Sequence, residues 1–129
     1  MGKLDSLVNK GGSWFYMLFR LLVGLLFFMH GLMKFSGGNS PSGMFLAAGI
    51  IELVVGAGVV LGFFTRGLAL VGALEMLVAF FWVHAKNGLN PLANNGEPAV
   101  LFFVAFLVLL VYGAQKWSLE MKLLKKEMF

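Results

Sequence analysis

The sequence has no cysteine and few charged residues. Without cysteine the chain can form no disulfide and no thiolate metal site, and it has no thiol for catalysis. Only 12% of the 129 residues are charged and 60% are hydrophobic, whereas an ordinary soluble domain has about a quarter of its residues charged. A water-soluble fold of this size could not bury so much apolar surface. The composition therefore predicts an integral membrane protein.

Signatures of several chemistries are also missing. The sequence contains no phosphate-binding loop, nucleophile elbow or nucleic-acid motif. No residue cluster indicates a metal site, and two histidines on separate predicted helices are a poor basis for haem. We therefore expect no metal, no covalently bound cofactor and no nucleic-acid partner, and any catalytic residue stays unknown. The net charge of +4 fits a protein oriented in a lipid bilayer, which is the expected partner.

Four apolar stretches are long enough to cross a membrane. A hydrocarbon core about 30 Å thick requires roughly 20 helical residues. The predicted spans are residues 14–34, 44–64, 67–86 and 97–115. The second and third are joined by the short Thr65-Arg66-Gly67 connection, so they must form an antiparallel hairpin. The predicted fold is an all-α, integral membrane four-helix bundle in a single domain, residues 1–129.

The ends of the fourth span carry recognisable signals. Asn95-Gly96-Glu97-Pro98 combines a capping residue, an acid at the positive end of the helix dipole and a proline in the first turn. Trp117 is typical of the membrane interface. Residues 118–129 form a basic amphipathic tail, which Ser118 can cap. This tail is either a short helix on the membrane surface or a frayed basic end.

The distribution of basic residues predicts the orientation. Cytoplasmic loops carry the excess of Lys and Arg. With the N-terminus in the cytoplasm, Lys34 and Lys86 lie outside. The residues on the inner side are Lys3, Lys10, Arg66, Lys116, Lys122, Lys125 and Lys126. We therefore predict a multi-pass protein of the cell membrane with both termini in the cytoplasm.

Five ionisable residues fall inside the predicted spans: Arg20, His30, Glu52, Glu75 and His84. Each costs at least about 2.5 to 3.5 kcal/mol at membrane depth, so such residues normally face the protein interior and have a partner. Helix rise places them at successive depths, with His84 nearest the outer surface and Arg20 deepest. They therefore form a ladder and not a single layer.

The predicted binding site is a pocket that opens outward and is lined by His30 and Glu52. Gly49 and Gly56 leave space on the face of Glu52, for a neighbouring backbone or for a ligand, and no obligate cation is expected at its depth. An Arg20–Glu75 ion pair is expected to form the floor. Alternatively, these charges only hold the helices in register.

Three further residues have secondary roles in this prediction. Lys34 shares a polar helix face with Arg20. His84 lies about 180° from Glu75 on a regular helix, so both should not face one site unless the helix bends. We expect His84 to make an interfacial hydrogen bond. Glu97 is the acid at the start of the fourth span.

Several of these motifs, in this order and spacing, resemble the DoxX family of small four-helix membrane proteins. The resemblance rests on Arg20, FFMHGLMKF at residues 27–35, ELVVG at 52–56, LGFFTR at 61–66, Glu75-Met76 with Ala79 and His84, NGEPA at 95–99 and WSLE at 117–120. Two departures are visible. The usual glycine pair before the glutamate is Asn95-Gly96 here, and the usual Ser-Leu-Asp ending reads Ser-Leu-Glu.

The resemblance implies a redox-associated membrane subunit, since relatives include a quinone-reducing subunit and members of membrane oxidoreductase complexes. His30, Glu52 and Arg20 would then surround a quinone or similar small hydrophobic head group, and a partner subunit would supply electrons. Two alternatives stay open: a small-solute or proton-coupled permease, and a non-catalytic assembly subunit. The sequence identifies neither the ligand nor the partner. It also leaves the oligomeric state open, and a homo-oligomer is one of the alternatives.

Overall fold

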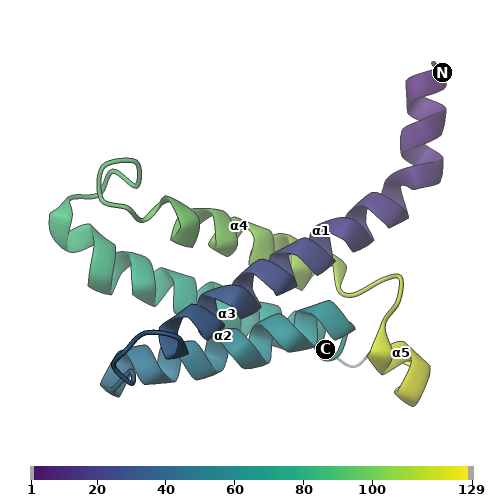
Figure 1. Cartoon of the computed structure of the whole chain (residues 1–129). Helices are drawn as coiled ribbons and strands as arrows, with labels where there is room; N and C mark the ends of the chain where they lie inside the picture. The colour runs from purple at the N-terminus through teal and green to yellow at the C-terminus, as the bar shows by residue number, and fades with distance from the viewer. Residues whose placement is uncertain (1, 128–129) are drawn as a thin grey trace.

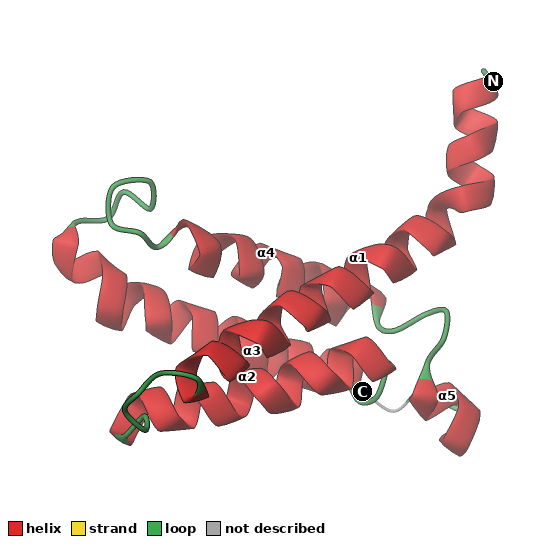
Figure 2. Ribbon diagram, in the orientation of Figure 1, coloured by secondary structure: helices red, strands yellow, loops and turns green. Residues whose placement is uncertain are grey.

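The computed structural model describes residues 2–127, which form helices joined by turns and loops (Figures 1 and 2). The helices are α1 (Lys3–Phe35), α2 (Gly43–Leu61), α3 (Thr65–Ala79), α4 (Glu97–Tyr112) and the short α5 (Leu119–Leu124). After α3 the chain continues as a π-helix, η1 (Phe80–His84), and a 3-10 turn, η2 (Ala85–Asn87). No strand occurs among the described residues, so the all-α prediction is confirmed there.

Three helical stretches are long and apolar enough to cross a membrane: Lys3–Phe35, Gly43–Leu61 and Thr65–Asn87. The fourth, Glu97–Tyr112, is apolar but shorter than the expected 97–115, with 16 residues. It ends at Gly113, where φ is 71°, and glycine at a positive φ commonly stops a helix. Gly62 ends α2 in the same way, with a φ of 68°, so the second span is also shorter than the predicted 44–64.

The first helix is longer than predicted. It begins at Lys3 instead of near Trp14, and its first turns extend away from the other helices (Figure 1). The backbone N–H of Gly2 donates to the Asp5 carboxylate at 2.8 Å, which satisfies one of the free groups at the helix start. The polar stretch before the first span is therefore part of α1.

The long helices pack mainly as two pairs, α1 along α2 and α3 along α4, with fewer contacts between the pairs. The first pair touches through Gly24 and Gly56, where a Cβ added to Gly56 would lie only 2.7 Å from the Gly24 carbonyl oxygen. Small residues at such crossings let helix backbones approach closely. The space beside Glu52 at Gly56 is thus filled by the neighbouring backbone and not left for a ligand.

Aromatic packing joins the two pairs. Phe27 of α1 contacts Phe102 and Phe106 of α4, with ring centroids 5.1 and 4.7 Å apart. Phe106 is fully buried, and its ring fills the space that a side chain at Gly72 of α3 would occupy. The core therefore lies at the level of these rings, midway along the paired helices.

Arg20 closes one end of the molecule, and the expected Arg20–Glu75 ion pair is wrong. The guanidinium is fully buried and donates four hydrogen bonds to backbone carbonyls. The acceptors are Ala114 at 2.6 Å, Lys116 at 2.8 Å, Trp117 at 3.1 Å and Val60 at 3.3 Å. The chain after α4 folds back over this end and offers its free carbonyls, which the planar fork of donors matches.

The segment after α4 is held to the same end by further contacts. The Tyr16 hydroxyl donates to the Gly113 carbonyl at 2.6 Å, and the Ser118 hydroxyl donates to the Gly62 carbonyl at 2.9 Å. Ser118 also accepts from the Met121 N–H, which confirms its predicted role as the cap of the tail helix. The tail is therefore an ordered helix over Leu119–Leu124 and not frayed there, and residues 128–129 lie outside the described residues.

Replacing Arg20 by methionine should lower the free energy of unfolding by about 3 kcal/mol, because buried carbonyls lose a charged donor. Arg20→Lys should recover only part of the loss, since an ammonium group cannot reproduce the guanidinium fork. Thermal unfolding in detergent micelles measures both effects. Lys10→Met, at an exposed position of α1, is the control and should change stability little. Equal stability of the Arg20→Met and Lys10→Met proteins would contradict a stabilising role of the Arg20 hydrogen bonds.

Candidate functional site

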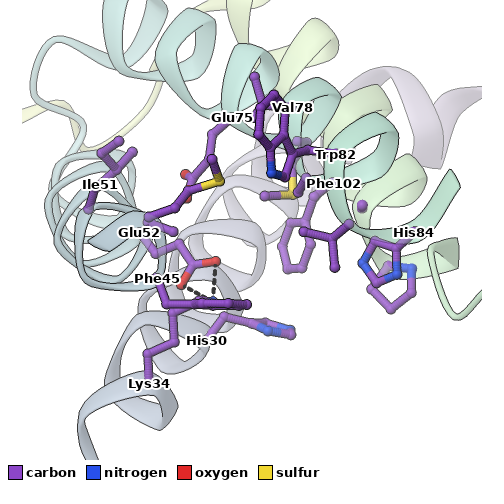
Figure 3. A pocket seen from close by; sticks show the side chains of 18 of the residues that line it. His30, Lys34, Phe45, Ile51, Glu52, Glu75, Val78, Trp82, His84 and Phe102 are labelled. Atoms are coloured by element: carbon purple, nitrogen blue, oxygen red, sulfur yellow. Dashed lines mark hydrogen bonds and ion pairs between the residues drawn. The ribbon is translucent and has the colours of Figure 1, made fainter. Parts of the chain in front are cut away.

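A cavity of about 890 Å³ lies between the two helix pairs (Figure 3), and Arg20 is not among the residues that line it. Its walls come from α1, α2, α3, η1 and α4 and are mostly apolar. The ionisable residues that line it are His30, Lys34, Glu52, Glu75, His84 and Lys86. Small-molecule sites in proteins have this character, an apolar cavity of several hundred cubic ångströms with a few polar groups. The cavity is therefore the candidate site.

Glu52 has a cation as its partner, contrary to the sequence prediction. Lys34 Nζ lies 2.8 Å from Oε1 and 2.6 Å from Oε2 of Glu52, and the carboxylate side chain is only 5% exposed (Figure 3). Lys34 lies in the last turn of α1, and its long stem reaches back toward the deeper carboxylate. Gly49 permits this approach, since a Cβ there would meet Phe35 and the Lys34 side chain. Helix phase and depth alone did not reveal this pairing.

Glu75 is an acid in the cavity wall that lacks a partner among the described residues. Both of its carboxyl oxygens are buried, and neither has a hydrogen-bond partner within residues 2–127. Glu75 lines the same cavity from α3 (Figure 3). Burying a polar group without a hydrogen bond is unfavourable. Glu75 is thus the cavity group that a hydrogen bond from or to a ligand would stabilise most.

His84 lines the cavity together with Glu75, although a regular helix would place them on opposite sides. The π-helix Phe80–His84 explains why both residues face the cavity, because its wider turn shifts the helical phase of the residues after Ala79. The predicted hydrogen bond of His84 is present, with Nδ1 3.1 Å from the Asn94 carbonyl oxygen. A carbonyl can only accept, so Nδ1 carries the hydrogen, and in the neutral ring Nε2 is an acceptor.

His30 lies in the cavity wall with its ring edge against Phe102, at a centroid distance of 5.4 Å (Figure 3). Sequence reasoning missed Phe102 and Trp82, which also line the cavity. An aromatic residue in a membrane helix is usually a packing or interface residue. The position of a tryptophan or phenylalanine along these helices therefore gives no signal that separates a cavity wall from a lipid-facing surface.

Two of the sequence candidates lie outside the cavity. Arg20 belongs to the opposite end and is engaged by backbone carbonyls. Glu97 begins α4 and is exposed, while its neighbours Asn95 and Pro98 line the cavity. The structure therefore brings together His30, Glu52, Glu75, His84 and Lys34.

Breaking the Lys34–Glu52 pair should destabilise the protein asymmetrically. Lys34→Met leaves a buried carboxylate without its cation and should lower the free energy of unfolding by about 3 kcal/mol. The double change Lys34→Met with Glu52→Gln should recover part of this loss, because no charge is then left unpaired. A double-mutant cycle of thermal unfolding measures the coupling.

The control is Lys86→Met, which removes an exposed lysine near the cavity mouth. This change should leave stability close to that of the unsubstituted protein. A Lys34→Met protein as stable as the control, or a double variant no better than the single one, would show that the pair does not stabilise the fold.

Comparison with known proteins identifies the family. The DoxX family model matches residues 15–85, more than half of the chain. A Haemophilus influenzae protein described as uncharacterized is 37% identical over 131 residues, which cover 92% of this chain and 98% of that protein. A Bacillus subtilis protein named "Putative oxidoreductase CatD" is 29% identical over 123 residues, 88% of this chain and 90% of the relative. No solved structure gives a significant match. The matched segment includes Arg20, His30, Glu52, Glu75 and His84, and the chain belongs to the DoxX family.

Proposed function

We propose that this chain is a redox-associated membrane subunit that binds a quinone or a similar small hydrophobic head group in the cavity between its helix pairs. The observation that carries the proposal is the unpartnered, buried carboxyl of Glu75 inside an otherwise mostly apolar cavity. A quinone needs an apolar slot together with hydrogen-bond partners for its two oxygens. The relative named as an oxidoreductase supports the redox class.

The proposal includes a transmembrane arrangement. α4 would be a fourth span, short but apolar, completing a four-helix bundle in the cell membrane. Lys3, Lys10 and Arg66, together with the lysines after α4, would lie on the cytoplasmic side with both termini. The cavity would then open toward the outer half of the membrane, and the end closed by Arg20 would face the cytoplasm.

The polar groups of the cavity suit both redox forms of such a ligand. The oxidised form presents carbonyl oxygens, to which Lys34 and a ring N–H of His30 can donate. The reduced form presents hydroxyl groups, which can donate to Glu75 or to Nε2 of His84. Reduction of a quinone to a quinol consumes two electrons and two protons, and a carboxyl or imidazole at the site can exchange the protons. The proposal assigns electron delivery to a partner redox protein, since the sequence carries no flavin, haem or cluster motif.

A path for solute across the molecule finds less support. The end opposite the cavity is filled by the Arg20 guanidinium and by the segment that binds it. The ionisable ladder therefore stops at Glu75, which favours a blind pocket over a permease. A cavity of this size is not expected in an assembly subunit that binds no ligand.

The test measures binding of a short-chain quinone analogue to the purified protein. Quenching of Trp82 fluorescence reports the binding. Glu75→Gln and His30→Ala should each weaken binding about tenfold, the effect of one lost hydrogen bond in a dry site. Glu97→Gln, at the exposed acid outside the cavity, should leave binding unchanged. Trp82→Phe identifies the quenched residue, since Trp14 and Trp117 contact each other elsewhere.

Two results would contradict the proposed function. One is the absence of saturable quinone binding by the unsubstituted protein. The other is binding that Glu75→Gln and His30→Ala leave as strong as Glu97→Gln does.

A further inference from the structure

The cavity has an apolar rim between α2 and α3. Phe45 on α2 and Val71, Leu74 and Val78 on α3 all line it, and these four side chains are 42–60% exposed. The two helices are joined by a short turn after Gly62, at the end that Arg20 closes, and they diverge from it toward the other end (Figure 1). The divergence leaves the cavity open to the side between them.

Ring contacts bridge α1 and α4 at the wall of the cavity. Phe102 of α4 packs against both Phe27 and His30 of α1, at 5.1 and 5.4 Å between centroids. A bulky ligand cannot pass between these rings without displacing them. For an apolar ligand the open route is therefore the one between α2 and α3, where the exposed lining side chains are apolar.

In the transmembrane arrangement proposed above, the opening would lie at the depth of the hydrocarbon core. Leu74 and Val78 lie near the middle of the Thr65–Asn87 stretch, which is long and apolar enough to span a membrane. At that depth an exposed apolar surface faces lipid chains and not water. A molecule that enters here comes from within the bilayer.

We infer that the ligand enters sideways from the bilayer between α2 and α3, and that it carries a long apolar tail which stays in this opening while the polar head lies at Glu75, Glu52 and Lys34. The inference rests on the proposed function and adds the ligand class, a lipid-soluble molecule with a tail. The carboxyl groups of Glu52 and Glu75 lie inside and apolar side chains of α2 and α3 lie at the rim, so one amphipathic molecule satisfies both. A tail-less ligand would instead come from water, past Lys86 and Asn95.

The experiment compares two probes in lipid nanodiscs, a benzoquinone without a tail and the same head group with a ten-carbon tail. Val78→Trp places an indole in the opening and should slow and weaken binding of the tailed probe about tenfold, the usual scale of a steric penalty. Binding of the tail-less probe should change less than about twofold. Val104→Trp is the matched control, because Val104 has the same 52% exposure on α4 and does not line the cavity.

A second measurement does not depend on tolerance of the new tryptophan. A tailed probe with a photoreactive group at the tail end should cross-link to peptides of α2 and α3 around Phe45, Val71 and Val78. Cross-links confined to residues 86–95, or equal effects of Val78→Trp on both probes, would overturn the lateral entry while leaving quinone binding intact. Failure of the unsubstituted protein to bind either head group would instead overturn the proposed function.

Discussion

Buried polar groups in this chain have to find partners within the protein, because a hydrocarbon environment offers none. The Nη1 and Nη2 groups of Arg20 satisfy this constraint with four backbone carbonyls, and Glu52 satisfies it with Lys34. Glu75 is buried in the cavity without such a partner among the described residues. The Arg20 hydrogen bonds join α1 to the segment after α4 at one end, whereas the Lys34–Glu52 pair joins α1 to α2 in the wall of the cavity. Among the described residues, the buried polar atoms without a partner that line the cavity are the two carboxyl oxygens of Glu75.

The two ends of the molecule are built for different purposes. At one end Arg20, Tyr16 and Ser118 bind the carbonyls of Gly62 and of the segment after α4, so helices and tail are locked together. Toward the other end α2 and α3 diverge, and the space between the pairs is lined by side chains instead of being filled by them. A rigid closed end and an open end fit a pocket whose walls keep their spacing while a ligand enters and leaves.

Sequence reasoning was right about the helical class, the family and the cap of the tail helix, and wrong about how the charges pair. Ser118 caps the tail and His84 makes a hydrogen bond, as predicted. Arg20 does not pair with Glu75, because folded-back backbone lies closer to it than any acid on a neighbouring helix. Glu52 is not free, because the flexible side chain of Lys34 reaches inward by a distance that the position of its Cα does not reveal.

Apolar run length and the scarcity of charge determined, from sequence alone, that this is a helical chain with long apolar spans, since these depend only on local composition and helix rise. The tertiary structure decided which acid lies unpartnered in the cavity, where the cavity opens, and that a π-helix turns His84 toward Glu75. These features depend on side-chain reach, on helix divergence and on a local change of helical phase. None of these three features produces a periodic pattern in the sequence. They are determined by contacts between segments that are distant in the sequence.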